Sequence, residues 1–314
     1  MTRVAAIDCG TNSIRLLVAD KKDGVLTDVA REMRVVRLGQ GVDATGSFAP
    51  EAIERTRVAL EEYVGIIRET GASALRMVAT SATRDASNRE EFFAMTRELL
   101  DPIVAGSVAE VITGDEEARL SFAGAVGELN AAGAPFVVVD LGGGSTELVL
   151  GDTKGVKAAF SANIGCVRLT ERFLHSDPPT AEEIAAARAY AREKLEEAFE
   201  EVPIGDASSW VGVAGTMTTI AAIAAGMPEY DAEKVHLSRV SFDDLFAVCD
   251  KLVGMTRAER AALGPMHPGR VDVIGGGSIV CSVLAEEFER RGAVSTLIVS
   301  EHDILDGIAL SIKV

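Results

Sequence analysis

Two segments of the chain share one order of apolar and polar positions. Each has an apolar run that ends in an aspartate, a turn of small residues, and a second apolar run: IDCGTNSIRLLVAD at Ile7–Asp20 and VDLGGGSTELVLGD at Val139–Asp152. Short apolar runs bounded by glycine-rich turns are typical of β-strands. The pattern therefore predicts the same strand-turn-strand hairpin in both halves of the chain.

The polar residues of the two hairpins also correspond. Aspartate, glycine and serine stand at matching offsets, as Asp8, Gly10 and Ser13 in the first copy and Asp140, Gly142 and Ser145 in the second. Glycine permits positive φ and a close approach of backbone N–H groups to an anion, which favours phosphate-binding loops. The alternative is a pair of tight hairpins in which glycine only satisfies the turn geometry. The matching offsets make that alternative the less favoured interpretation.

The loops offer groups for both a phosphate and a metal ion. The expected phosphate ligands are N–H and hydroxyl groups of Thr11, Asn12, Ser13, Gly143, Gly144 and Ser145. A carboxylate repels an anion, so Asp8 and Asp140 are expected to hold Mg²⁺, which prefers oxygen ligands. Two such loops facing each other would bind a phosphate chain from both sides.

The chain between the hairpins predicts a meander followed by helices. DGVLTDVAREMRVVRLG predicts two further strands, with a turn at Asp23–Gly24. Apolar spacings of three and four predict a helix that begins at Pro50 and ends at Gly71. ALRMVATSATRDASN then predicts a strand, a loop and a new helix, where Ser87 and Glu90 have capping-box spacing. Strand, helix and strand in this order imply a parallel crossover.

The pattern begins again near Ala125. FVVVD, ELVLG and VKAAFSA predict strands, and a helix from Thr180 to about Glu201 follows, with a capping box of Thr180 and Glu183. Two glycine-rich junctions, WVGVAGTMTTIAAI and DVIGGGSIVCSVL, are each predicted to lead from a strand into a helix. Such junctions direct N–H groups and the helix dipole toward a ligand. The alternative is close helix packing, which glycine permits.

Length and charge limit the classes of function. A chain of 314 residues fits two domains. Its formal net charge of −17 argues against a general nucleic-acid binder and against a protein that sits on anionic lipid, because both need a broad basic face. No leader and no apolar run of membrane-spanning length is recognised, so a soluble, cytoplasmic protein is expected.

The cysteines and histidines do not form a pattern typical of a disulfide, a zinc site or a catalytic residue. The cysteines are far apart and are expected to be buried thiols: Cys9, Cys166, Cys249 and Cys281. None of the four histidines is expected to be catalytic, and His236 and His302 have no partner recognisable in the sequence.

Seven segments, taken in order, resemble a known family. DCGTNSIRLLVAD, ATSATRDASN, VITGDEEARLSF, VVVDLGGGSTELV, NIGCVRLTERF, GVAGTMTT and DVIGGGSIV are similar to the short form of the exopolyphosphatase and guanosine pentaphosphate phosphohydrolase (Ppx/GppA) family, within the sugar kinase, Hsp70 and actin superfamily. The resemblance implies an α/β fold of two ribonuclease H-like (actin-like ATPase) domains around a central cleft that holds substrate and Mg²⁺. The implied domains are residues 1–124 plus 301–314, with the first loop, and residues 125–300, with the second.

The resemblance also implies roles for single residues. Asp140 matches the family's metal-binding aspartate, Glu147 matches the nearby acidic position, and Asp8 is the symmetry-related candidate for a metal-bound water. Arg84 matches an arginine that contacts phosphate, with a surface ion pair as the alternative. Arg168 in GCVRLTERF is a further candidate.

Two adjacent glutamates in TGDEEARL compete for the role of general base, which orients or deprotonates the attacking water. Thr113 and Glu116 have capping-box spacing, which would turn Glu116 back onto the helix start and leave Glu117 to face the cleft. The family pattern also points to Glu117. A helix N-terminus favours an ionised carboxylate, so Glu117 is expected to be ionised until the transition state forms.

These assignments predict a Mg²⁺-dependent exopolyphosphatase that removes the terminal phosphate of inorganic polyphosphate. Longer family members carry an additional helical domain, and the chain stops before it, so short chains are the expected substrate. Hydrolysis of guanosine pentaphosphate is the close alternative, because both substrates present a terminal phosphoanhydride. A superfamily kinase or a nucleotide-switched scaffold is less favoured, because GDEEARL provides for water. The family implies a homodimer, whereas the net charge and the lack of a long apolar run predict no bound DNA or RNA and no membrane.

Overall fold

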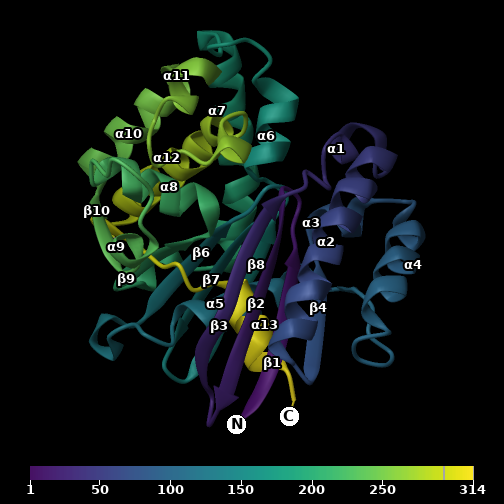
Figure 1. The fold of residues 1–314 in the computed structure, drawn as a ribbon. Coiled ribbons are helices and arrows are strands. Elements are labelled where there is room, and N and C mark those ends of the chain that lie inside the picture. Colours follow the sequence, from purple (N-terminus) through teal and green to yellow (C-terminus); the bar gives the residue numbers. More distant parts are fainter. Residues whose placement is uncertain (293, 314) are drawn as a thin grey trace. The chain divides into compact units, whose positions relative to one another are not determined.

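The computed structural model of the chain describes residues 1–292 and 294–313 (Figure 1). The chain forms two compact units, Met1–Gly124 with Ile304–Val314, and Ala125–Asp303. The chain thus crosses twice from one unit to the other, at the end of a helix near Ala125 and shortly before the last helix.

The first unit is built on a five-stranded sheet in the order β3-β2-β1-β4-β5. Its strands are β1 (Thr2–Cys9), β2 (Ser13–Lys22), β3 (Val25–Val35), β4 (Ala74–Ala79) and β5 (Glu110–Val111). β1 pairs antiparallel with β2 and parallel with β4, which confirms the predicted crossover. Asp23 and Gly24 have φ of 51° and 80° and make the predicted turn. The expectation of two strands after this turn was wrong, because one strand, β3, runs through the segment.

Helices cover both faces of this sheet. α2 (Pro50–Thr70) and α4 (Arg89–Leu100) pack on one face, against side chains such as Ile7 and Leu16. α5 (Gly114–Ala125) and α13 (Ile304–Ser311) pack against the alternate positions, among them Val4 and Leu17. Successive strand residues point to opposite faces, so an unbroken apolar β1 can serve both layers. The short helices are α1 (Val42–Thr45) and α3 (Ser81–Asp85).

The second unit repeats this connectivity in a six-stranded sheet, β10-β11-β9-β6-β7-β8. Its strands are β6 (Phe136–Leu141), β7 (Thr146–Asp152), β8 (Gly155–Ala162), β9 (Ser209–Val213), β10 (Ser238–Ser241) and β11 (Thr296–Val299). β6 lies between antiparallel β7 and parallel β9, as β1 lies between β2 and β4. The predicted α/β class of two ribonuclease H-like domains is confirmed.

The helices of the second unit surround one large apolar core. They are α6 (Cys166–Phe173), α7 (Ala181–Glu201), α8 (Ala214–Ala224), α9 (Ala232–Val235), α10 (Phe242–Gly254), α11 (Arg257–Ala261) and α12 (Ile274–Arg291). The capping box of Thr180 and Glu183 is confirmed at the start of α7. The one expected from Ser87 and Glu90 is wrong, because α4 begins after Asn88 and the Ser87 hydroxyl lies 2.8 Å from that of Ser47.

The glycines of DVIGGGS have a packing role. A short 3-10 turn, Pro268–Arg270, and not a strand leads into α12, so the predicted strand-to-helix junction is wrong here. A Cβ on Gly276 would lie 2.4 Å from the Thr170 hydroxyl, and one on Gly277 would lie 2.6 Å from that of Thr216. These glycines let α12 approach α6 and α8 closely, which was the alternative interpretation.

All four cysteines are buried free thiols. No helix in residues 1–292 or 294–313 combines the length and the apolar character needed to cross a bilayer.

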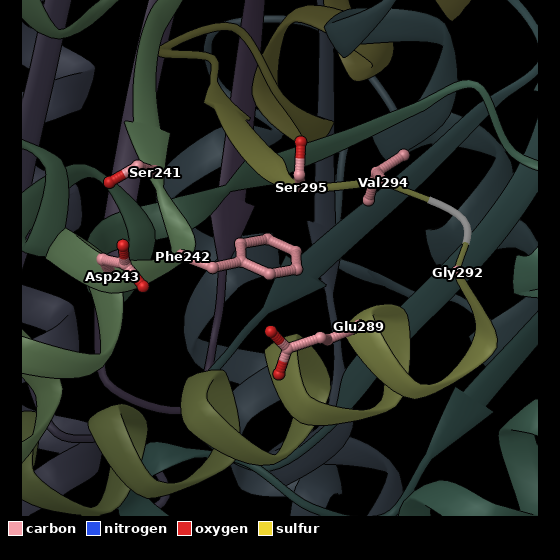
Figure 2. Close-up of a pocket in the computed structure, with 7 residues that line it drawn as sticks. All are labelled: Ser241, Phe242, Asp243, Glu289, Gly292, Val294 and Ser295. Atoms are coloured by element: carbon pink, nitrogen blue, oxygen red, sulfur yellow. The ribbon is translucent and has the colours of Figure 1, made fainter.

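A surface hollow of about 510 Å³ lies beside β10 and the end of α12 (Figure 2). The Phe242 ring lies among its labelled residues, and the charged side chains among the described lining residues are Asp243 and Glu289. Two carboxylates make the hollow unsuitable for a phosphate. None of the residues predicted to bind phosphate lines it.

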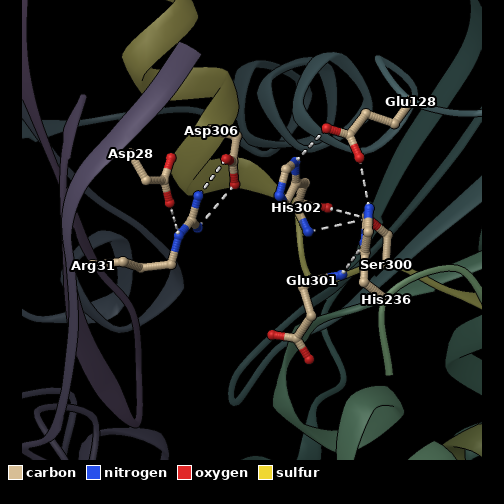
Figure 3. Close-up of polar contacts among 8 residues, drawn as sticks. All are labelled: Asp28, Arg31, Glu128, His236, Ser300, Glu301, His302 and Asp306. Atoms are coloured by element: carbon tan, nitrogen blue, oxygen red, sulfur yellow. Dashed lines mark hydrogen bonds and ion pairs between the residues drawn. The ribbon is translucent and has the colours of Figure 1, made fainter. Parts of the chain in front are cut away.

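The last helix is fixed to the first sheet by charge and by close backbone approach. Asp306, on α13, is buried and accepts a 2.6 Å bond from Arg31 on β3, which also pairs with Asp28 (Figure 3). Lys21 donates to the Ile312 carbonyl at 2.8 Å. A Cβ on Gly307 would lie 1.9 Å from the Leu120 carbonyl oxygen, so α13 meets α5 at backbone distance.

We therefore expect Gly307→Ala to lower the free energy of unfolding by about 1–3 kcal/mol, because the added methyl group forces the two helices apart. Gly65→Ala in α2 is the matched control, since its Cβ would meet nothing within 4 Å. It should raise stability by up to about 1 kcal/mol through helix propensity. Urea denaturation measures both, and equal stability of the two variants would contradict the close approach of α13.

Candidate active site

Both predicted hairpins are present and are closed by the same hydrogen bond. The Gly10 amide donates to the Ser13 carbonyl at 2.9 Å, and the Gly142 amide donates to the Ser145 carbonyl at 3.1 Å. Each loop follows a strand whose final residues include the predicted aspartate. The duplication seen in the sequence is therefore a duplication of backbone geometry.

The reason for glycine in these loops differs from the expected one. Neither Gly10 nor Gly142 has φ in the left-handed region. A Cβ on Gly142 would lie 3.1 Å from the Ser145 carbonyl oxygen, which is a tight contact. A Cβ on Gly165 would lie 2.4 Å from the backbone of Gly143. Gly142 and Gly165 are therefore glycine because neighbouring backbone leaves no room for a side chain, and not because the chain needs positive φ there.

In the first loop, carbonyl oxygens are bound by the segment that follows β3. The Thr11 carbonyl accepts from the Gly39 amide at 2.8 Å, and the Asn12 carbonyl accepts from Arg37 at 2.8 Å. Thr11 is buried, whereas Asn12 and Ser13 are half-buried. Carbonyl oxygens repel anions, so their engagement by N–H groups favours a phosphate at this loop.

The second loop is held in the same manner by the start of α6. Amides at the helix N-terminus donate to loop carbonyls, Cys166 to Gly142 at 3.0 Å and Val167 to Gly143 at 2.9 Å. Arg168 adds a 2.8 Å bond from Nε to the Gly144 carbonyl. The structure therefore assigns Arg168 a contact with the loop itself. Ser145 at the end of the loop is buried.

A pair of acidic residues lies beside the second loop. Asp140 and Glu147 are direct partners across the antiparallel β6–β7 pair, so their side chains share one face of the sheet. Both are buried, at 7% and 1% exposure. Glu147 accepts a 2.7 Å bond from the Ser161 hydroxyl. Two buried carboxylates on one face of a sheet favour a cation, and their oxygen atoms suit Mg²⁺.

The equivalent position in the first hairpin has the opposite charge. Asp8 pairs across β1–β2 with Arg15, and the Arg15 guanidinium lies 2.7 Å from the Asp8 carboxylate. The sequence analysis did not assign Arg15. The sequence does contain a sign of this difference. When the two hairpins are aligned at Ser13 and Ser145, the residues two positions later are Arg15 and Glu147. The duplicated strands thus present an ion pair in one unit and an acidic pair in the other.

Glu117 and Arg84 come together in the first unit, from different helices. Arg84, on α3, donates from Nη1 to Glu117 Oε2 at 2.7 Å and to the Ile112 carbonyl at 3.1 Å. Glu117 lies in the first turn of α5 and is 7% exposed. The Thr80 hydroxyl also hydrogen bonds to it. The alternative of an exposed surface ion pair for Arg84 is not what the structure shows, because the pair is largely buried.

Burial dominates the ionisation of Glu117. Desolvation raises its pKa to about 7, against the opposing effect of Arg84, and the negative charge of Asp8 adds to the rise. The expectation that the helix N-terminus keeps Glu117 ionised was therefore wrong, because burial has the larger effect on its pKa. A carboxylate with a pKa near neutrality is instead a better proton acceptor than an ordinary glutamate.

The neighbouring Glu116 has a different environment. Thr113 Oγ1 accepts the Glu116 amide at 3.2 Å, which is one half of the expected capping box. The Glu116 carboxylate does not turn back but pairs with Arg76 at 2.6 Å, and its side chain is 44% exposed. The predicted contact of the Glu116 carboxylate with the helix start was wrong, because this carboxylate pairs with Arg76. The two adjacent glutamates do differ in environment, since Glu116 is exposed and Glu117 is buried.

The GVAGTMTT junction has the predicted strand-to-helix form, since β9 ends at Val213 and α8 begins at Ala214. Ala214 has φ of 71°, an unusual value for alanine. A Cβ on Gly215 would lie 2.5 Å from the Arg270 guanidinium, which donates to the Thr219 hydroxyl at 3.0 Å. The sequence pattern gave no sign that Arg270 would reach the start of this helix.

Comparison with known proteins agrees with this geometry. The model of the Ppx/GppA phosphatase family matches residues 17–312. The chain belongs to this family. It is 64% identical over 316 residues to exopolyphosphatase 2 of Mycobacterium tuberculosis, covering 99% of each chain.

Two solved structures are similar to this Ppx/GppA chain. An exopolyphosphatase-like protein has a TM-score of 0.94 at 48% identity, over 98% of this chain and 97% of the other. An exopolyphosphatase of Cytophaga hutchinsonii has a TM-score of 0.84 at 25% identity, over 98% and 96% of the two chains. The predicted family is confirmed.

Because Arg84 lowers the pKa of Glu117, we expect Arg84→Gln to raise that pKa further above about 7. Carbon-13 NMR titration of labelled glutamate carboxyls measures the change. Arg119→Gln is the matched control, since Arg119 lies on α5 but pairs with exposed Asp115. A Glu117 pKa that is unchanged or lowered in Arg84→Gln would contradict the described ion pair.

Proposed function

We propose that this chain is an exopolyphosphatase, which hydrolyses the terminal phosphoanhydride bond of inorganic polyphosphate. The observation that carries the proposal is the buried Glu117 carboxylate held against Arg84, with a pKa raised to about 7. The high identity to a protein named exopolyphosphatase 2 supports the same substrate class.

Glu117 is the proposed general base. The oxygen of a water molecule forms a bond to the terminal phosphorus, and the bond from that phosphorus to the bridging oxygen breaks. The water gives a proton to the Glu117 carboxylate, and the products are orthophosphate and a chain shortened by one phosphate. A base whose pKa lies near the working pH is partly ionised and still has a useful driving force for accepting a proton.

Arg84 is proposed to bind the phosphoryl group while it holds the base. Within the described residues, its hydrogen bonds come from Nη1, to Glu117 and to the Ile112 carbonyl. The guanidinium has five N–H donors in a planar fork that suits phosphate oxygens. Its side chain is 23% exposed, so solution molecules can reach it.

Asp140 and Glu147 are the proposed Mg²⁺ ligands. Two buried carboxylates on one face of the sheet give an all-oxygen donor set, which fits this ion. Bound Mg²⁺ would neutralise charge on the phosphate oxygens. Asp8 stays a candidate for holding a metal-bound water, but Arg15 already balances its charge, and this favours the acidic pair of the second unit as the principal ligands.

The loop residues complete the proposed substrate contacts. Amides and hydroxyls of Thr11, Asn12 and Ser13 are proposed to bind phosphate in the first unit, and those of Gly143, Gly144 and Ser145 in the second. The chain carries a formal net charge of −17, which would repel a long polyanion outside the loops. Short polyphosphates are therefore the proposed preferred substrates. A homodimer and a cytoplasmic location stay predictions from the family.

Phosphate release decides between the two family substrates. Purified protein with Mg²⁺ is given short polyphosphate, long polyphosphate and guanosine pentaphosphate side by side. We expect the fastest release from short polyphosphate. Faster release from the nucleotide would favour the alternative activity, which has the weaker support because the named relatives are exopolyphosphatases.

In the same assay, Glu117→Gln should lower kcat by at least about 100-fold, because an amide cannot accept the water's proton. Glu116→Gln is the matched control: the residue is adjacent, acidic and exposed, and it pairs with Arg76 outside the proposed chemistry. Its kcat should stay within about twofold of wild type. Full activity of Glu117→Gln in folded protein would refute Glu117 as the base.

Asp140→Asn should raise the Mg²⁺ concentration needed for half-maximal activity by about tenfold or more, because the site loses an ionised ligand. A Mg²⁺ titration of phosphate release measures this. Asp243→Asn, an exposed acidic residue of the same unit, serves as control and should not change the requirement. An unchanged requirement in Asp140→Asn would place the metal elsewhere.

A further inference from the structure

Three side chains with no role predicted from the sequence gather in the second unit. Glu128, His236 and His302 each offer one ligand atom, and these atoms lie within 4.8 Å of one another. Figure 3 shows the Glu128 carboxylate reaching both histidine rings, with one oxygen toward each. The two rings stack with centroids 4.7 Å apart.

The three residues come from separate segments of the unit. Glu128 follows α5, His236 lies between α9 and β10, and His302 lies between β11 and α13. Glu128 and His302 are both within four residues of a point where the chain passes between the two compact units. A link among them would therefore join the two crossing segments at their ends in the second unit.

We propose that Glu128, His236 and His302 form a binding site for Zn²⁺. Two imidazole nitrogens and one carboxylate oxygen are a donor set that proteins use for zinc, with a fourth position left for water. Imidazole favours Zn²⁺ over the hard ions Mg²⁺ and Ca²⁺. The site is thus chemically distinct from the all-oxygen pair of Asp140 and Glu147.

Hydrogen bonds and ion pairs link the three side chains through the Glu128 carboxylate. His236 Nδ1 accepts the Glu301 amide at 3.2 Å, which leaves its ring proton on Nε2, 2.8 Å from Glu128. His302 Nδ1 lies 3.8 Å from the other oxygen of the same carboxylate. A proton therefore occupies the place between His236 and Glu128 that the metal ion would take.

Binding requires two small changes. If Nε2 of His236 coordinates the metal ion, the ring proton lies on Nδ1. Nδ1 then no longer accepts a hydrogen bond from the Glu301 amide, which donates to water instead. The three ligand atoms must also close from within 4.8 Å to the roughly 3.3 Å separation set by Zn–N and Zn–O bonds of about 2.0–2.1 Å. The Glu128 side chain is 54% exposed and can move to do so, and the Glu301 carboxylate is bonded to the Tyr230 hydroxyl instead.

Calorimetric titration of the full chain with ZnCl₂ tests the proposal. Saturating Mg²⁺ is present, so that the acidic pair of the second loop is occupied. We expect one Zn²⁺ per chain and a loss of affinity of at least about tenfold in His302→Gln and in His236→Gln. His175→Gln is the matched control, because this exposed histidine lies outside the cluster, and its affinity should equal that of wild type.

Two further variants keep the result decisive. Glu128→Gln alters an exposed side chain, so it should fold normally. It should also weaken Zn²⁺ binding at least about tenfold. If a histidine variant does not fold, this variant tests whether the cluster binds the ion. Asp140→Asn should bind Zn²⁺ as wild type does, which separates this site from the proposed Mg²⁺ site.

Zinc should also raise the thermal midpoint of wild type and not that of Glu128→Gln. No binding to wild type, or equal binding in wild type, His302→Gln and Glu128→Gln, would overturn the proposal and leave the cluster as a proton-bridged contact.

Discussion

The antiparallel pairing of the first two strands in each unit, closed by a glycine amide on a serine carbonyl, is the constraint on which the proposed site depends. This hydrogen bond places the loop directly after the aspartate at the strand's end. The strand register then decides what lies beside the aspartate, Arg15 for Asp8 and Glu147 for Asp140. The same backbone geometry therefore places an ion pair in one unit and a buried acidic pair, the proposed Mg²⁺ ligands, in the other.

The environment of Glu117 shows how burial competes with local electrostatics. The helix N-terminus and Arg84 favour the ionised carboxylate, yet desolvation outweighs them and raises the pKa to about 7. The folded chain consequently binds this proton more tightly than the unfolded chain does. The stabilisation from that proton is complete at low pH and is lost as the pH rises from about 4.5 toward 7, so ionising Glu117 costs stability.

Close packing explains several of the glycines in the chain. Gly276 and Gly277 admit side chains of α6 and α8, Gly215 admits the Arg270 guanidinium, and Gly307 admits the backbone of α5. A Cβ at any of these positions would enter a space that another element already fills. Other glycines serve the backbone instead: Gly24 has φ of 80° in a turn, and Gly71 has φ of 71° at the end of α2.

The sequence by itself determined the hairpins, their duplication, the long helices and the family. These follow from local rules: apolar runs of strand length, Pro50 and Gly71 at helix ends, and a capping box at Thr180.

Only the tertiary structure decided what depends on neighbours distant in sequence. Arg15 acquired its partner from the strand register, the pKa of Glu117 from burial, and the Gly276–Gly277 contacts from helix packing. His236 and His302 looked isolated because their common partner, Glu128, is more than a hundred residues away from each. Residue spacing encodes local hydrogen bonds, whereas desolvation and contact between separate segments exist only once the chain has folded.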